Sequence, residues 1–164
     1  TIDNFSFITI GGNLEVTTDE YVFIQQGEDA SWETFNESEG AGELFVANEE
    51  LNYTITAFGT TDWHNKLVIK PLPLTALASY RFEFEIRADK EIEGVFIANE
   101  IGTWNPVVYT SISISNTPTL LSFVTDGMIF SDLSIELLWQ FGGYATNVAP
   151  AIIVLSQLTI YQIV

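Results

Sequence analysis

The segment 140–143, Gln-Phe-Gly-Gly, combines residue types that can bind an uncharged ligand. It closes a stretch, 134–141, in which residues 135, 137, 139 and 141 are all apolar, so their side chains would share one face of a strand. Glu136, Leu138 and Gln140 would then lie on the opposite face, where the Gln140 amide offers a donor and an acceptor. Such a group suits a hydroxyl-rich ligand such as a sugar. The alternative is an exposed glutamine at a strand-end turn, which is the commoner case for such a segment alone.

The carboxylates and the single histidine do not have the spacing of a catalytic or metal centre. Segment 83–89 comes nearest to the Glu-x-Asp-x-x-Glu strand of a jelly-roll glycosidase, but its spacing differs. His64 stands beside Asp62 in an expected turn, so we expect it at the solvated surface. The sequence has no cysteine and no nucleophile elbow, P-loop or dinucleotide motif. We therefore expect a protein that is not an enzyme.

The charge balance restricts the class of ligand. The 22 Asp and Glu residues against 5 Lys and Arg give a formal net charge of −17, which repels phosphate backbones, anionic lipid and acidic polysaccharides. We therefore expect no nucleic-acid and no membrane partner, and a neutral ligand. The 164 residues, 47% of them hydrophobic, suit one folded domain over 1–164. The chain is expected to be a mature protein or a fragment of a longer one.

Nearly every segment alternates polar and apolar residues with period 2, and none has the pattern of an amphipathic helix. The clearest strand covers 80–87. Other expected strands, separated by breakers that include the prolines of 71–73, cover 51–56, 66–70, 92–99, 107–115, 120–124, 134–141 and 151–163. Many short strands with regular turns predict an antiparallel β-sandwich.

The four tryptophans are expected in different places. Trp139 shares the parity of the core residues around it, whereas Trp32 is expected to cap one end of the sandwich. We expect a structural role for Trp63 at the start of a strand. Trp104 lies in an expected loop, where stacking on a ligand and plugging the core are equally consistent with the sequence.

Several short motifs follow one another in a recognisable order. Segment 51–56, Trp63, Leu67, and then 72–74 and 80–88 resemble motifs of the family 4/9/16/22 group of carbohydrate-binding modules. Segment 140–143 resembles the Gln-Leu-Gly-Gly end of a cleft strand in family 4, and 155–160 resembles the closing strand. The resemblance extends from residue 32 to residue 160, and the order of the motifs carries it rather than any single one.

This resemblance implies a β-jelly roll in which one concave sheet forms an open groove for a single polysaccharide chain. By position, Gln140 matches the groove glutamine, Trp104 a groove aromatic, and Phe35 a second aromatic on the opposite lip. Asn99 or Glu100 occupies the place of a groove amide. The groove arginine of the family has no counterpart, because Gly94 stands at the matching position.

Many members of the family also hold a structural calcium ion with an aspartate of the closing strand. Ser156 stands at that position in this chain. Calcium takes oxygen ligands, and the chain offers carboxylates and carbonyls but only one imidazole. Asp3 is the carboxylate that we name first for a calcium site near the first and last strands.

The pattern and the resemblance together predict a non-catalytic, extracellular module, monomeric within a larger secreted multidomain chain and appended to a glycoside hydrolase. The expected ligand is a neutral polysaccharide or oligosaccharide, β-1,3- or mixed-linkage β-glucan first and β-1,4-glucan or xylan second. Glu136 and Phe96 join the candidate contacts on the non-core face. The alternative is a structural or adhesive domain of a cell-surface or assembly protein. Phe96 and Leu138 favour that alternative, because an assembly surface needs a broad apolar patch.

Overall fold

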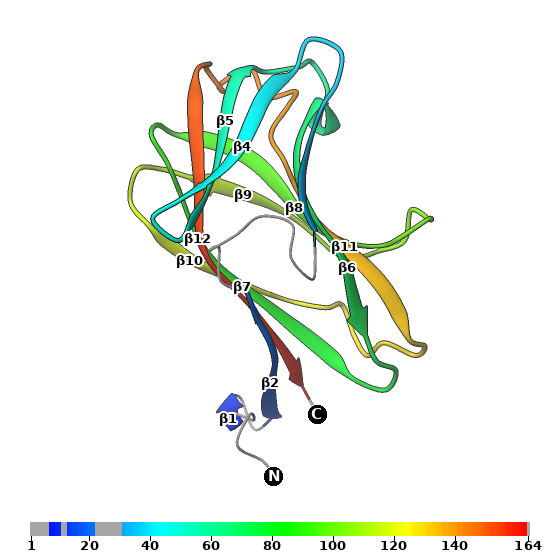
Figure 1. Ribbon diagram of the computed structural model, residues 1–164. Helices are drawn as coiled ribbons and strands as arrows, with labels where there is room; N and C mark the ends of the chain where they lie inside the picture. The colour runs from blue at the N-terminus through cyan, green and yellow to red at the C-terminus, as the bar shows by residue number, and fades with distance from the viewer. Residues whose placement is uncertain (1–6, 11–12, 22–30, 164) are drawn as a thin grey trace.

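The structure of the protein, a computed structural model, describes residues 7–10, 13–21 and 31–163. These residues form two antiparallel sheets that face each other as a jelly-roll sandwich, with a single 3₁₀ turn, η1 (Asp62–His64) (Figure 1). The prediction of an all-β sandwich with little or no helix is therefore confirmed. In this part of the chain, no helix is long and apolar enough to cross a membrane.

The first sheet has seven strands among these residues, in the order β1-β2-β12-β5-β4, with β7 paired to β12 and β10 paired to β7. They are β1 (Phe7–Ile10), β2 (Asn13–Tyr21), β4 (Ala41–Ala47), β5 (Glu50–Ala57), β7 (Ser79–Ala88), β10 (Thr119–Val124) and β12 (Ala151–Ile163). The second sheet has five strands in the order β3-β6-β11-β8-β9. They are β3 (Ser31–Asn36), β6 (Asn65–Leu74), β8 (Ile92–Glu100), β9 (Pro106–Ile114) and β11 (Leu133–Gln140).

Strand β12 joins the parts of the first sheet. Its first half, from Ala151 to Leu155, pairs with β5, and its second half, from Leu158 to Ile163, pairs with β2. On the other edge of β12, strand β7 pairs with nearly the whole length of β12. Among the described residues, the three partner strands therefore meet only through β12, which runs down the sheet beside β7 in Figure 1.

The core lies between the two sheets and contains the inward side chains of both. On β11, Ile135, Leu137 and Trp139 are fully buried, as the alternation in the sequence predicted. The ring of Trp139 packs against Trp32 at 5.8 Å and against Phe84 at 5.3 Å between centroids. Trp32 is therefore a core residue, packed between the sheets rather than placed only as an end cap.

Phe96 is the clearest correction to the expected site. The prediction placed it on the non-core face, but its side chain is fully buried in the core and stacks on Phe123 at 5.6 Å. The register explains the error, because Phe96 lies opposite Trp139 and therefore faces inward with it. Phe96 and Asn99 are three residues apart, so they point to opposite faces of β8.

The prolines of 71–73 do not end a strand as expected, because β6 continues through them to Leu74. Leu72 and Leu74 face the core, and the prolines alternate with them on the outside. The described part of strand β3 pairs with β6 as far as Lys70, so among the described residues the prolines have no neighbouring strand on that edge of β6. A proline is tolerated at such an edge because its missing N–H donor is not needed there.

Candidate functional site

A pocket of about 450 Å³ opens on the outer face of the second sheet. We call it the β11 pocket, because outward side chains of β11 lie in it. Its lining comes from η1, from strands β6, β11, β8 and β9, and from the loop 101–105. The lining residues are Asp62, Trp63, Lys66, Asn99, Thr103, Trp104, Tyr109, Glu136, Leu138 and Gln140. Four of the predicted contacts, Trp104, Gln140, Asn99 and Glu136, are therefore brought together.

Gln140 lies in the β11 pocket with an unpaired side-chain amide. Its side chain is only 5% exposed, yet no described residue hydrogen-bonds to the amide. Its amide atoms are not among the buried side-chain atoms that lack a partner, so they reach the space of the pocket and can exchange hydrogen bonds there. The Gln140 amide is therefore free to bind a group that enters the pocket.

Asn99 lies in the same pocket, but its amide is fully used. Its Nδ2 donates to the backbone oxygen of Thr103 at 2.9 Å and to Oε1 of Glu136 at 3.2 Å. Its Oδ1 accepts from the backbone N–H of Asn105 at 2.9 Å. Asn99 therefore ties the loop 101–105 to the sheet, and its contribution is to position Trp104 rather than to offer a free groove amide.

Glu100 faces away from the β11 pocket. Its Oε2 accepts hydrogen bonds from Asn105 Nδ2 at 3.1 Å and from Thr103 Oγ1 at 3.3 Å. The residue lines a separate cavity of about 330 Å³ with Phe130 and other residues beyond the loop. The sequence-based alternative of Asn99 or Glu100 is thus decided by alternation along β8, which leaves only Asn99 on the pocket side.

The loop carries Trp104 into solvent at the rim of the pocket. The indole is 64% exposed, so the interpretation of Trp104 as a core plug is wrong. Tyr109, on β9, is 57% exposed and meets the indole edge to face at 6.3 Å. Two large aromatic surfaces therefore stand together on this side of the pocket. Aromatic rings held in this way can cover the apolar face of a flat ligand.

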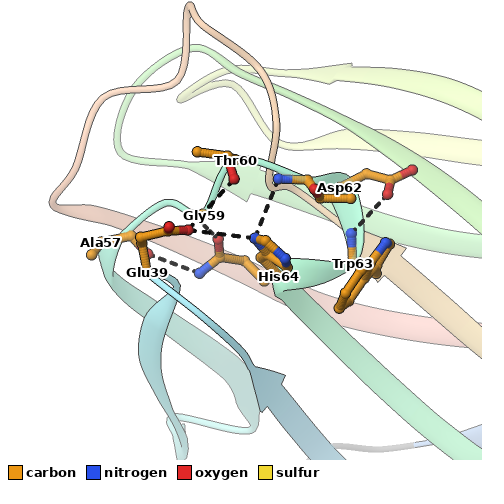
Figure 2. Close-up of polar contacts among 9 residues, drawn as sticks. Glu39, Ala57, Gly59, Thr60, Asp62, Trp63 and His64 are labelled. Atoms are coloured by element: carbon orange, nitrogen blue, oxygen red, sulfur yellow. Dashed lines mark hydrogen bonds and ion pairs between the residues drawn. The ribbon is translucent and has the colours of Figure 1, made fainter.

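Trp63 provides an aromatic surface from η1, and the sequence interpretation assigned it only a structural role. It lines the β11 pocket and is half-exposed. Figure 2 shows the turn that holds it, in which the Trp63 backbone N–H donates to Asp62 Oδ1. The backbone N–H of Thr61, just before the turn, donates to His64 Nδ1. His64 is buried rather than solvated, because Trp63, Gly59 and Glu39 surround its ring.

The two glycines after Gln140 hold η1 against the end of β11. A Cβ atom on Gly142 would lie 2.1 Å from the backbone oxygen of Thr61. The Gly142 N–H donates to the backbone oxygen of Asp62 at 3.1 Å, and the Gly143 N–H donates to the backbone oxygen of Gly59 at 2.9 Å. The glycine pair is therefore needed for close approach, and it places Trp63 beside Gln140.

We expect Gly142→Ala to lower the free energy of unfolding by about 3 kcal/mol, because the added Cβ meets a backbone atom that cannot rotate away. That loss corresponds to a melting temperature lower by roughly 8 °C for a domain of this size. Gly127→Ala is the control: its Cβ would meet nothing within 4 Å, so only the strain of its φ of +87° remains. Thermal unfolding followed by circular dichroism measures both. Equal losses in the two variants would contradict the close-approach argument.

The charges around the pocket are arranged in one short network. Glu136 accepts from Asn99 and lies 4.0 Å from Lys70 Nζ, which in turn is 3.3 Å from Glu33. Lys66, also in the pocket, makes no ion pair with any described residue.

Beside η1, burial raises the pKa of Tyr144, and the Asp62 carboxylate adds to the effect. The phenol of Tyr144 therefore stays neutral at neutral pH.

The remaining predicted residues lie elsewhere. Phe35 is on the outer face of β3 but not in the pocket lining, and the ammonium groups of Lys66 and Lys70 lie 4.9 and 6.0 Å from its ring centre. Gly94 faces the core, since a Cβ there would lie 2.7 Å from the Phe141 ring, so its position could not present a groove arginine. Asp3 lies outside the described residues.

The sequence interpretation missed Trp63, Lys66 and Tyr109. Lys66 and Tyr109 have the outward parity of their strands, so the alternation that identified Gln140 could also have found them. Trp63 gave no such signal, because its position depends on the contact between η1 and the glycine pair.

Comparison with known proteins is informative at the level of structure only. No family profile and no curated protein matches the sequence. A solved structure described as "CBM4 structure and function" aligns with a TM-score of 0.69 at 12% identity, over 87% of this chain and 94% of that one. The apo form of CBM1 of BiXyn10A gives 0.67 at 12% identity, over 88% and 96%. The N-terminal cellulose-binding domain of β-1,4-glucanase C from Cellulomonas fimi gives 0.62 at 14% identity, over 82% and 90%. The chain therefore has the jelly-roll fold of these carbohydrate-binding modules.

Proposed function

We propose that the protein is a non-catalytic carbohydrate-binding module of the family 4-like group, and that the β11 pocket binds a single polysaccharide chain. The observation that carries the proposal is the Gln140 amide, which is nearly buried, unpaired and flanked by exposed aromatic rings. A pyranose ring has apolar C–H faces and hydroxyl edges, so it needs aromatic faces and amide groups at the same site. The fold shared with cellulose-binding and other carbohydrate-binding modules supports the same assignment.

The ligand that we propose is a neutral main chain, with β-1,3- or mixed-linkage β-glucan first and β-1,4-glucan or xylan second. A net charge of −17 opposes polyanionic chains, whereas a neutral glycan is indifferent to it. The setting that fits such a module is a secreted, multidomain glycoside hydrolase.

Affinity electrophoresis against laminarin, barley β-glucan, soluble cellulose, xylan and mannan tests the proposal. We expect at least one of the first four to retard the protein, at low and at high salt alike, because binding of an uncharged ligand is not screened. If all five leave the mobility unchanged, the module does not bind these chains and the proposal fails.

Asn99→Ala provides a second test, because it removes the hydrogen bonds that hold the loop 101–105, and the Asn99 amide that makes them has no free group left for a ligand. We expect binding of the retarding glycan to weaken roughly three- to tenfold, about 0.7–1.4 kcal/mol, as Trp104 loses its fixed position. Asn52→Ala is the matched control, because it removes one hydrogen bond on β5, from the Asn52 side-chain amide to the Glu50 backbone oxygen. This variant should bind like the parent. Titration calorimetry compares them. Parent-like affinity in a folded Asn99→Ala protein would show that the loop needs no such anchor.

A structural or assembly role is the second candidate, and one observation favours it. Leu77, Met128 and Phe130 are 70%, 48% and 82% exposed, and the Leu77 N–H donates to Ile129 next to the other two. Exposed apolar side chains that gather at one end of a domain are a common feature of protein interfaces. This candidate replaces the first if no polysaccharide binds and the protein self-associates in sedimentation experiments.

Calcium near the first and last strands stays a proposal that the described residues do not strengthen. No three histidine or carboxylate side chains are grouped for a metal in this part of the chain. The hydroxyl of Ser156 donates to Glu85 at 2.8 Å, so it is already engaged. We expect a chelator to lower the melting temperature, since a ligand of the native state stabilises it, and an unchanged melting temperature would count against the site.

A further inference from the structure

Lys66 is the one positively charged residue in the lining of the β11 pocket. Its ammonium group lies 4.9 Å from the Phe35 ring centre, and among residues 7–10, 13–21 and 31–163 it has no ion-pair partner. A cation over an aromatic face is held in place but keeps its hydrogen-bond donors. Lys66 therefore brings to the edge of the pocket an ammonium group that is held in place and still able to bind an anion.

The lack of a partner is unusual in this chain, which has 22 carboxylates for 5 cationic residues. Arg81 pairs with Glu83, Arg87 with Glu50, and Lys70 with Glu33 and Glu136. Only Lys66 and Lys90, which lies in the turn between β7 and β8, make no ion pair within the described part of the chain. Of these two, Lys66 alone lines the pocket.

A second unpaired donor stands beside it. Lys66 on β6 lies directly opposite Gln140 on β11, and side chains paired in this way on one face are close neighbours. Both residues line the pocket, and the Gln140 amide has no described partner. Neighbouring positions at the pocket therefore supply one ammonium group and one amide N–H, a pair of donors that matches the two oxygens of a carboxylate.

We infer that the β11 pocket prefers a neutral main chain that carries uronosyl units, with Lys66 and Gln140 binding the uronate carboxylate. This inference rests on the proposed function and names a finer class of ligand for the same site. Hydrogen bonds from a cation to a carboxylate are shorter and stronger than those between neutral groups. A hydroxyl group in the same place would gain less.

The other charges limit how many uronosyl units can bind. Asp62 and Glu136 also line the pocket, and both are engaged: Asp62 Oδ1 accepts from the Trp63 N–H, and Glu136 contacts Asn99 and Lys70. They repel any further anion, as does the net charge of −17. The preference is therefore for isolated uronosyl units on a neutral chain, not for a polyuronate.

Titration calorimetry with two matched ligand pairs tests the inference. The first is a xylo-oligosaccharide with one glucuronosyl branch and the same compound after reduction of its carboxylate to an alcohol. The second is a mixed-linkage gluco-oligosaccharide with and without one C6 carboxylate. For a pair that binds, we expect the acidic member to bind at least fivefold more tightly at low salt. This preference should shrink at high salt, because the charge pair is screened.

The readout that identifies Lys66 is the ratio of acidic to neutral affinity. We expect this ratio to fall to about one in Lys66→Met and to stay at the parent value in Lys90→Met, which changes the net charge equally. Neutral members that bind as tightly as acidic ones, or a preference that survives in Lys66→Met, would overturn the inference and leave the proposed function intact. If no member of either pair binds, the proposed function fails for these chains and the inference fails with it.

Discussion

Trp104→Ala is expected to weaken glycan binding by tenfold or more while leaving the fold intact. An indole that stacks on a sugar buries apolar surface worth roughly 25 cal/mol per Å², so about 60 Å² corresponds to the 1.4 kcal/mol of a tenfold change. The indole is 64% exposed and its ring contact is with Tyr109, itself at the surface, so removing it opens no cavity in the core. Titration calorimetry with the retarding glycan measures the change.

The control for Trp104→Ala is Phe130→Ala, which removes an even more exposed aromatic ring from the cavity beyond the loop. It should bind as the parent does. Gln140→Ala should weaken binding less than Trp104→Ala, because an amide exchanges hydrogen bonds with water for hydrogen bonds with sugar at a small net gain. A folded Trp104→Ala protein with parent affinity would mean that the ligand lies elsewhere.

Phe96→Ala is expected to act on folding, although the sequence interpretation placed Phe96 among the ligand contacts. The ring is fully buried, and its centroid lies 4.9 Å from that of Phe84 and 5.2 Å from that of Trp139. Truncating such a phenylalanine typically costs about 3–5 kcal/mol, from lost burial and from the cavity left behind. The melting temperature should fall by roughly 10 °C.

Phe35→Ala is the matched control for that loss, because it removes the same side chain from the outer face of β3, where Phe35 is partly exposed. Its effect on the free energy of unfolding should stay below about 1 kcal/mol. Urea unfolding of the two variants gives the comparison. Similar losses in both would contradict the core position of Phe96.

Strict alternation was the most reliable guide from sequence to site. It placed Gln140 and Glu136 outside and Trp139 inside, because β11 stays extended and one of its faces is completely covered. The same rule, counted correctly along β8, also places Phe96 inside and Asn99 outside. The error at Phe96 was therefore one of parity and not of principle.

The residues that sequence reasoning could not assign depend on contacts between distant segments. Trp63 reaches the pocket because η1 docks on Gly142 and Gly143, about 80 residues later in the chain. The interpretation of His64 as a solvated residue failed for the same reason, since the segments around η1 bury its ring. The residues of this short turn do not themselves indicate that it docks on the glycine pair or that the His64 ring is buried. Such positions can be read only once the topology is known.

The position of β12 has a consequence for the order in which the domain forms. Strands β2, β5 and β7 are made early, but each pairs with residues 151–163, so the first sheet stays divided until that segment has been synthesised. Strand β12, which is made last, then has to pair with β2, which begins at Asn13, and with β7, which begins at Ser79, so these pairings connect residues far apart in the chain. Pairings of such long sequence separation fold slowly, because the loops that they close lose much conformational entropy first. Until residues 151–163 emerge from the ribosome, the unpaired edges of β2, β5 and β7 are the surfaces that a nascent chain would have to protect from aggregation.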